Sequence, residues 1–131
     1  MNRQQIVDLI DWDLVIKAPR YSGGHSEVME AIFGDNASVL AFYREDDYQG
    51  ILAYAYQFND GTVVIITDSF GSCSGCDAWE CCSDQDAKIM IQSLVDSARI
   101  FENSNDAREF CETKTDDAEH YLFRVAKYLK F

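Results

Sequence analysis

Apolar side chains in the middle of the chain recur with the two-residue period of β-strands. Residues 38–43 form a dense apolar run, and residues 48–58 alternate large side chains on one face with small ones on the other. The large set is Leu52, Tyr54, Tyr56 and Phe58, and the small set is Ile51, Ala53, Ala55 and Gln57. Small side chains predict that another element, which we expect to be a helix, packs closely on their face. The turn Asn59-Asp60-Gly61 and residues 62–69, which are rich in β-branched side chains, complete a three-stranded antiparallel meander.

The two ends of the chain follow the helical period instead. The first stripe is Ile6, Leu9, Ile10 and Leu14, and Ser83 with Asp86 predicts a capping box before a stripe that continues to Phe101. The predicted helices span residues 3–14, 26–33, 83–101 and 116–129, with a short helix or turn at 103–111. Because the strands form one block between helices, we predict a single α+β domain over residues 1–131. In this fold, helices from both termini pack against one face of the antiparallel meander.

Composition narrows the classes of function. The chain has 131 residues, with 23 acidic and 11 basic side chains, a formal net charge of -12 and a pI near 4.3. This charge disfavours direct binding to nucleic-acid phosphates or to an anionic membrane. No apolar run approaches the length that spans a bilayer, and the first residues lack the apolar stretch of a signal peptide. We therefore expect a soluble, cytoplasmic protein.

Four of the five cysteines lie in one short segment, residues 70–82, between the last predicted strand and a helix. Cys73 and Cys76 form a C-x-x-C pair, and Cys81 and Cys82 follow. A zinc site could use Cys73, Cys76 and one of the adjacent pair, because neighbouring side chains point apart. The fourth ligand would then be one of His25, Cys111 and His120.

Two other interpretations of this segment involve reactive thiols. Cys73 and Cys76 could form a thiol-disulfide redox pair, or Cys73 could act as a nucleophile with His25 or His120. Asp77 and Glu80 count against the redox pair, because adjacent carboxylates raise a thiol pKa. We favour a loop whose thiols and Trp79 pack into the core, so no cofactor is expected and zinc is the alternative.

Part of the chain resembles a known group of proteins. Tyr48-Gln49-Gly50, the following hairpin, and Phe70-Gly71-Ser72-Cys73-Ser74-Gly75-Cys76-Asp77 with Glu80 are similar to small uncharacterised proteins encoded by bacteriophages. The resemblance covers about residues 48–82 and implies a phage or mobile-element origin. That family has no established activity, so the resemblance assigns no catalytic residue.

The acidic side chains predict a protein-binding surface that imitates nucleic-acid phosphates. The candidate partner-binding residues are Glu45, Asp46, Asp47, Asp77, Trp79, Glu80, Asp84 and Asp86. The surface is expected to continue through Asp106, Glu109, Glu112, Asp116 and Asp117, with Tyr43 and Tyr48 as further anchors. The simpler interpretation is that these charges only keep the protein soluble.

The leading hypothesis is therefore a non-enzymatic inhibitor of a basic host protein, such as a nuclease, a repressor or another defence or nucleic-acid-binding protein. The sequence has no P-loop, dinucleotide-binding, EF-hand or H-E-x-x-H motif, and we assign no catalytic residue. The alternatives are a small zinc-binding domain and a thiol-disulfide oxidoreductase. A homodimer is also left open, because the aromatic face of residues 48–58 suits either a core or a dimer interface.

Overall fold

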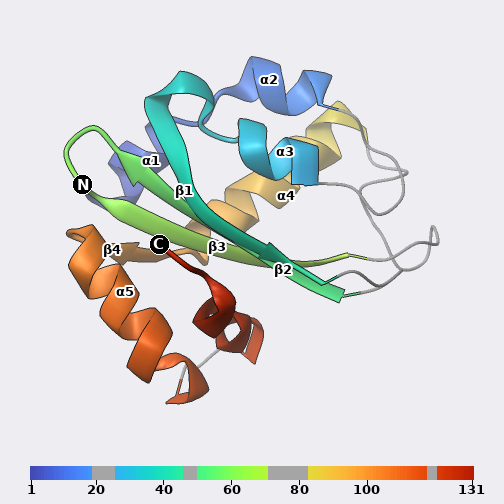
Figure 1. Ribbon diagram of the computed structural model, residues 1–131. Helices are drawn as coiled ribbons and strands as arrows, with labels where there is room; N and C mark the ends of the chain where they lie inside the picture. Colours follow the sequence, from blue (N-terminus) through green and yellow to red (C-terminus); the bar gives the residue numbers. More distant parts are fainter. Residues whose placement is uncertain (19–25, 46–49, 71–82, 118–120) are drawn as a thin grey trace.

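The computed structural model describes residues 1–18, 26–45, 50–70, 83–117 and 121–131. Its centre is an antiparallel sheet of four strands in the order β1-β2-β3-β4 (Figure 1). The strands are β1 (Ala37–Arg44), β2 (Gly50–Phe58), β3 (Val63–Phe70) and β4 (Arg99–Phe101). The fold is thus α+β, and the predicted three-stranded meander forms most of the sheet. Within the described residues, no helix is long and apolar enough to cross a membrane.

The fourth strand, β4, was not predicted. Ala98 and Phe101 continue the apolar spacing of the preceding helix, so the sequence pattern extends that helix to Phe101. In the structure, α4 (Asp84–Asp96) ends at Ser97, and Arg99–Phe101 pairs with β3. The predicted capping box at the start of α4 is present, with Ser83 and Asp86 each bonding to the other's backbone.

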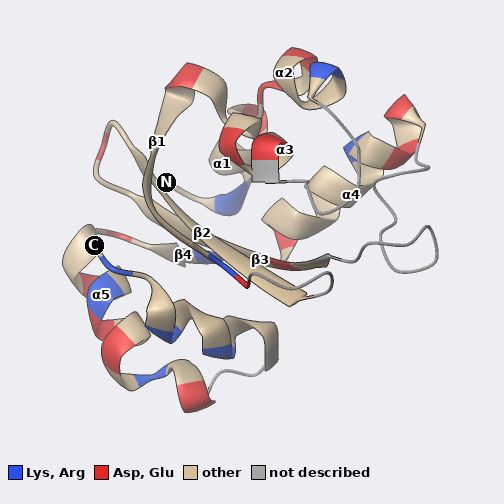
Figure 2. Ribbon diagram, turned by 45° about the vertical axis from the view of Figure 1, so that its right-hand side comes forward, with Lys and Arg blue, Asp and Glu red and all other residues tan. Residues whose placement is uncertain are grey.

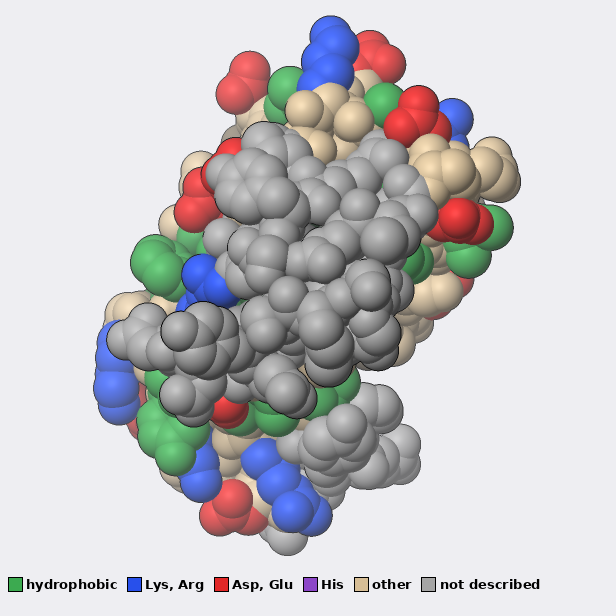
Figure 3. Space-filling model, turned by 90° about the vertical axis from the view of Figure 1, so that its right-hand side faces the viewer, with side chains coloured by type: hydrophobic (Ala, Val, Ile, Leu, Met, Phe, Trp, Pro, Cys, Tyr) green, Lys and Arg blue, Asp and Glu red, His purple; other side chains and the backbone are tan. Residues whose placement is uncertain are grey.

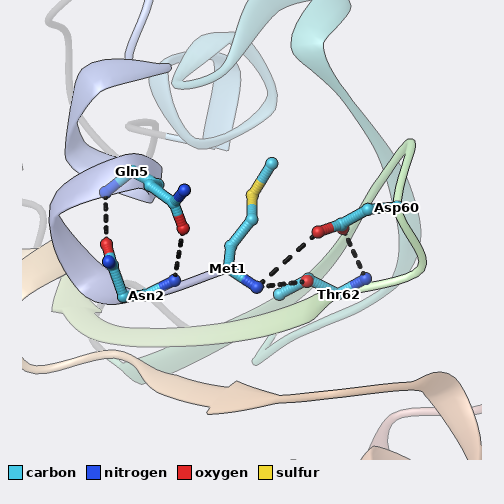
Figure 4. A network of polar contacts seen from close by, with 5 residues as sticks. All are labelled: Met1, Asn2, Gln5, Asp60 and Thr62. Carbon is cyan, nitrogen blue, oxygen red and sulfur yellow. Dashed lines mark hydrogen bonds and ion pairs between the residues drawn. The ribbon is translucent and has the colours of Figure 1, made fainter.

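The β2–β3 turn is the predicted hairpin, and the first residues of the chain are bound to it (Figure 4). Gly61 has a φ of 93°, a conformation that favours glycine. The Thr62 backbone N–H donates to Asp60 Oδ1 at 2.9 Å, and the Met1 amine donates to Thr62 Oγ1 at 3.1 Å. The Met1 amine also lies 3.6 Å from Asp60 Oδ2. These donors, the Thr62 N–H first, lower the pKa of Asp60.

One face of the sheet is covered by four helices, which we call the α1–α4 layer. It comprises α1 (Arg3–Asp8), α2 (Trp12–Lys17), α3 (Ser26–Ala31) and α4, with a short 3₁₀ helix η1 (Gly34–Asn36) after α3. The aromatic side chains of β2 pack beneath it, and the Tyr56 hydroxyl donates to the Met29 carbonyl at 2.6 Å. The aromatic face of β2 is therefore core.

The first helical segment differs from the prediction. Residues 3–14 form two helices, because Asn2 caps α1 and Asp11 begins a second helix by accepting from the Leu14 N–H. The Asp11 N–H in turn donates to the Ile32 carbonyl at 2.7 Å, which fixes the bend beside the end of α3. Leu14 consequently lies off the buried stripe and is 42% exposed.

The other face of the sheet carries a second layer, so the prediction that helices cover only one face is wrong. This α5–η3 layer comprises α5 (Ser104–Thr113), η2 (Thr115–Asp117) and η3 (Tyr121–Tyr128). Ala53 and Ala55 lie under this layer in a second core, which also contains Phe110 and Cys111 of α5 and Ala126 of η3. Helices therefore pack on the face of β2 with small side chains, as expected from the sequence. Residues 116–129 were predicted as one α-helix, but their described parts are 3₁₀ helix.

Candidate protein-binding surface

The described candidate residues border one end of the molecule. Glu45 follows β1 and is half-buried, whereas Asp84 and Asp86 begin α4 and are exposed. Asp46, Asp47, Asp77, Trp79 and Glu80 lie outside the described residues. Figure 3 views this end of the molecule, where charged side chains of described residues border the grey region.

Asp86 has a structural role as well as a charge. Its N–H donates to Ser83 Oγ at 3.1 Å, and the Ser83 N–H donates to Asp86 Oδ2 at 3.3 Å. An acidic side chain in the first turn also favours the helix through the helix dipole. The presence of Asp86 therefore has an explanation without a partner.

The expected continuation of the acidic surface is divided by the sheet. Asp106, Glu109 and Glu112 lie on α5 and Asp116 on η2, on the side of the sheet opposite α4. Basic side chains balance them there, with Lys114 3.7 Å from Glu109 and Lys127 4.0 Å from Asp116. From α5 to the last residue, residues 104–117 and 121–131 contain five acidic and five basic residues.

The α1–α4 layer carries most of the uncompensated charge. Residues 1–18, 26–36 and 83–98 contain nine acidic and three basic residues, a difference of -6. Figure 2 shows acidic residues on every helix of this layer, whereas α5 carries both signs and the charged residues of η3 are basic. The sequence pattern could not reveal this, because residues 1–36 and 83–98 are separated in the chain by the strands β1–β3. They come together only when both segments pack on the same face of the sheet.

Helix electrostatics explains some of these acids and not others. Six lie at helix N-caps or in first turns, where carboxylates are favourable: Asp11, Asp13, Glu27, Asp35, Asp84 and Asp86. The other three are Asp8, Glu30 and Asp96, which lie in the last turns of α1, α3 and α4, where the dipole favours cations. Those last turns contain no basic residue.

Two apolar side chains that the sequence did not suggest as anchors are exposed on the same layer. Leu14 on α2 is 42% exposed and Ile89 on α4 is 55% exposed. Of the predicted aromatic anchors, Tyr43 is half-buried with its ring 4.8 Å from that of Tyr128, and Tyr48 and Trp79 lie outside the described residues.

The thiol and metal hypotheses depend on residues outside the described part of the chain: Cys73, Cys76, Cys81, Cys82, His25 and His120. The remaining ligand candidate, Cys111, is 2% exposed in the core under α5. Burial, with a smaller contribution from Glu112, raises the pKa of Cys111 to about 11, which disfavours the thiolate that binds metals. Among the described residues, no three His, Cys, Asp or Glu side chains are grouped to hold a metal ion.

The chain matches no family model, no curated protein and no solved structure.

Proposed function

We propose that this chain is a small, acidic, non-enzymatic binding protein of phage or mobile-element origin. It inhibits a host nucleic-acid-binding or defence protein by occupying that protein's basic groove in place of nucleic acid. The observation that carries this proposal is the charge of the α1–α4 layer, which has nine acidic and three basic residues while the opposite layer is balanced. A surface that served solubility alone would not need to concentrate charge on one side.

The three acids at helix C-terminal ends support a binding role most directly. Asp8, Glu30 and Asp96 are exposed and oppose the helix dipoles, so helix electrostatics does not explain their negative charge. Asp8 and Asp96 accept side-chain hydrogen bonds from Gln4 at 2.9 Å and Gln92 at 3.0 Å. These contacts hold both carboxylates on the surface and leave further oxygen lone pairs for a partner's lysine or arginine.

The test begins with a captured partner. The protein is used to isolate a basic protein from a bacterial lysate at low salt, and labelled duplex DNA is then competed from that partner. We expect displacement of the DNA and a steep loss of affinity between low and high salt, because surface charges are screened over about 10 Å at 0.1 M salt. A captured partner that releases no DNA, or whose affinity does not change with salt, would contradict the proposal.

Two matched triple variants localise the binding surface. Asp8→Asn/Glu30→Gln/Asp96→Asn removes three charges from the α1–α4 layer, and Asp106→Asn/Glu109→Gln/Glu112→Gln removes three from α5. We expect the first to weaken partner binding on the order of tenfold, and the second by less than about twofold. Equal effects would mean that net charge, and not this layer, determines binding.

The zinc alternative is tested on the same preparation. Native mass spectrometry of freshly reduced protein should give the bare chain mass, alone or with a basic partner attached. A mass higher by one zinc ion, with a melting temperature that falls in excess chelator, would instead support a metal-stabilised domain organised by Cys73 and Cys76.

A further inference from the structure

The outer edge of β1 borders a groove that shares only Glu30 with the proposed acidic surface. Within the described part of the chain, β1 is an edge strand that pairs with β2 alone. The groove beside it has a volume of about 590 Å³. Its lining residues come from α3, β1 and the C-terminal segment: Glu30, Val39, Leu40, Ala41, Phe42 and Lys130.

The backbone of β1 is oriented to pair with a further strand. The Glu45 N–H donates to the Ile51 carbonyl at 3.2 Å, and the register places Phe42 opposite Tyr54. Hydrogen-bonded and non-bonded pairs alternate along an antiparallel ladder, so Glu45 belongs to a bonded pair and Phe42 to a non-bonded one. The Phe42 N–H and carbonyl therefore point away from β2, toward the open edge.

Two apolar side chains are exposed at this edge. Phe42 is 60% exposed and its ring stacks on Tyr54 at 5.5 Å, while Val39 is 39% exposed. Val39 pairs with Tyr56 and Phe42 with Tyr54, and both tyrosines lie in the core beneath the α1–α4 layer. Val39 and Phe42 are therefore on the α3 side of the sheet. A bulge between Val39 and Ala41 interrupts the ladder, but the register from Ala41 to Arg44 is regular. A regular edge strand with an exposed aromatic side chain is a site for strand addition.

We propose that the β1 edge binds an extended segment of a basic partner, which adds to the sheet as a fifth strand. Alternate side chains of that segment would face α3, where Glu30 and the acidic layer favour lysine or arginine and where Phe42 and Val39 favour apolar stems. This inference deepens the proposed function and rests on it, because both require a partner with a basic surface.

Charge selects this occupant over a second copy of the chain. Antiparallel pairing of two β1 strands about a two-fold axis would place both α1–α4 layers on the same side of a continuous sheet. Each of these layers has six more acidic than basic residues, so the two would repel each other. A basic segment at the same edge is attracted by the α1–α4 layer instead, and in the groove lining itself Glu30 and Lys130 offset each other.

The probe is a synthetic ten-residue peptide in which lysine alternates with valine and threonine. Its control has the same sequence with alternate backbone nitrogens methylated, which keeps charge and side chains but removes the N–H groups of one strand edge. We expect the first peptide to shift the amide resonances of Val39 and Phe42 and to slow hydrogen exchange at Phe42. We expect the methylated peptide to bind at least fivefold more weakly.

Other outcomes separate this inference from the proposed function. Equal binding of both peptides, with shifts centred on Ile89 of α4, would overturn the β1 assignment and leave the acidic layer as the binding surface. Absence of any shift at β1 would also overturn the assignment. The DNA competition experiment decides the proposed function independently of both results.

Variants of Phe42 test the edge from the protein side. Phe42→Ala removes the ring, and Phe42→Pro also removes the outward N–H without removing a β1–β2 hydrogen bond. We expect the peptide to bind Phe42→Pro about fivefold more weakly than Phe42→Ala, and to bind Ile89→Ala as it binds the unaltered protein. Equal affinities of the two Phe42 variants would contradict strand pairing, and the methylated peptide gives the same test if Phe42→Pro does not fold.

Discussion

The two layers that enclose the sheet differ in both packing and charge. Beneath the α1–α4 layer, the β2 side chains are Leu52, Tyr54, Tyr56 and Phe58, and the exposed side of the layer is acidic. Beneath the α5–η3 layer, β2 contributes Ala53 and Ala55, and the exposed charges balance. The two faces of β2 therefore differ, because large side chains lie between the sheet and one layer, whereas alanines allow η3 of the other layer to contact β2 directly.

The comparison suggests a division of roles between the layers. Ion pairs such as Glu109–Lys114 stabilise the α5–η3 layer modestly, and its described acidic and basic residues are equal in number. The α1–α4 layer obtains its stability from an aromatic core, which permits an unbalanced surface above it. Four predictions follow from this difference, beginning with the largest effect.

Phe33→Ala should be the most damaging change to the α1–α4 layer. The Phe33 ring lies 5.0 Å from that of Tyr56 and 4.9 Å from that of Phe58, in edge-to-face contacts, and the residue is 1% exposed. A large cavity should lower the free energy of unfolding by about 3–5 kcal/mol. Urea unfolding measures this, with the exposed Ile89→Ala as a control that should cost less than about 1 kcal/mol.

Alkaline pH should destabilise the packing of the α1–α4 layer on the sheet through two tyrosines of β2, Tyr54 and Tyr56. Burial, and then the charge of Glu30, raises the pKa of Tyr54 to about 12, and burial also raises the pKa of Tyr56 well above 10. A raised folded-state pKa gives stability that is complete below the unfolded value of about 10 and is lost as the pH rises toward the folded value. We expect Tyr54 alone to account for a loss on the order of 2 kcal/mol between about pH 10 and 12. Tyr56 adds to this loss, so Tyr56→Phe should reduce the total.

Ala55→Leu tests the closer packing of the α5–η3 layer. Ala55 is fully buried in the second core, and β2 contacts η3 directly. Extra side-chain volume there should cost about 1–3 kcal/mol by forcing η3 away from the sheet. The control Ala37→Leu, at a half-buried position, should lower the free energy of unfolding by less. If thermal unfolding shows no loss of stability for Ala55→Leu, the interface between β2 and η3 is loosely packed.

The smallest effect concerns the two charge variants already described. Asp8→Asn/Glu30→Gln/Asp96→Asn should leave stability unchanged or raise it by about 0.5 kcal/mol, because these carboxylates oppose helix dipoles. Asp106→Asn/Glu109→Gln/Glu112→Gln should lower it by about 0.5–1 kcal/mol, because it removes a first-turn acid and an ion pair. The reverse order would assign the acids of the α1–α4 layer a structural role.

The sequence predicted those elements whose local signals agree with the final packing. The β2 alternation, the Gly61 turn and the Ser83–Asp86 capping box are all as expected. Where local and tertiary signals differ, prediction failed: Ala98 and Phe101 keep a helical spacing, yet β3 recruits Arg99–Phe101 as a strand. The three β4 residues are too few to show a strand period of their own.

The candidate site was less predictable than the fold, for a topological reason. Asp84 and Asp86 were identified from their own segment, but the acids of residues 8–35 were not among the candidate residues. Their membership of one surface depends on α1 and α2 packing against α4 across the same face of the sheet. Those contacts join residues 3–17 to residues 84–96, and no local pattern encodes them.

The burial of Cys111 makes the alkylation rate of its thiol a measure of how readily the α5–η3 layer opens. Its thiol, 2% exposed and with a pKa near 11, reacts with an alkylating reagent only when α5 separates from the sheet. In a mass spectrum of the alkylated and then proteolysed chain, which separates Cys111 from the four other cysteines, the tag on Cys111 therefore records how readily that layer opens in the native state. A partner or substitution that stabilises the packing of the α5–η3 layer would slow the alkylation of Cys111 without any change in the average structure.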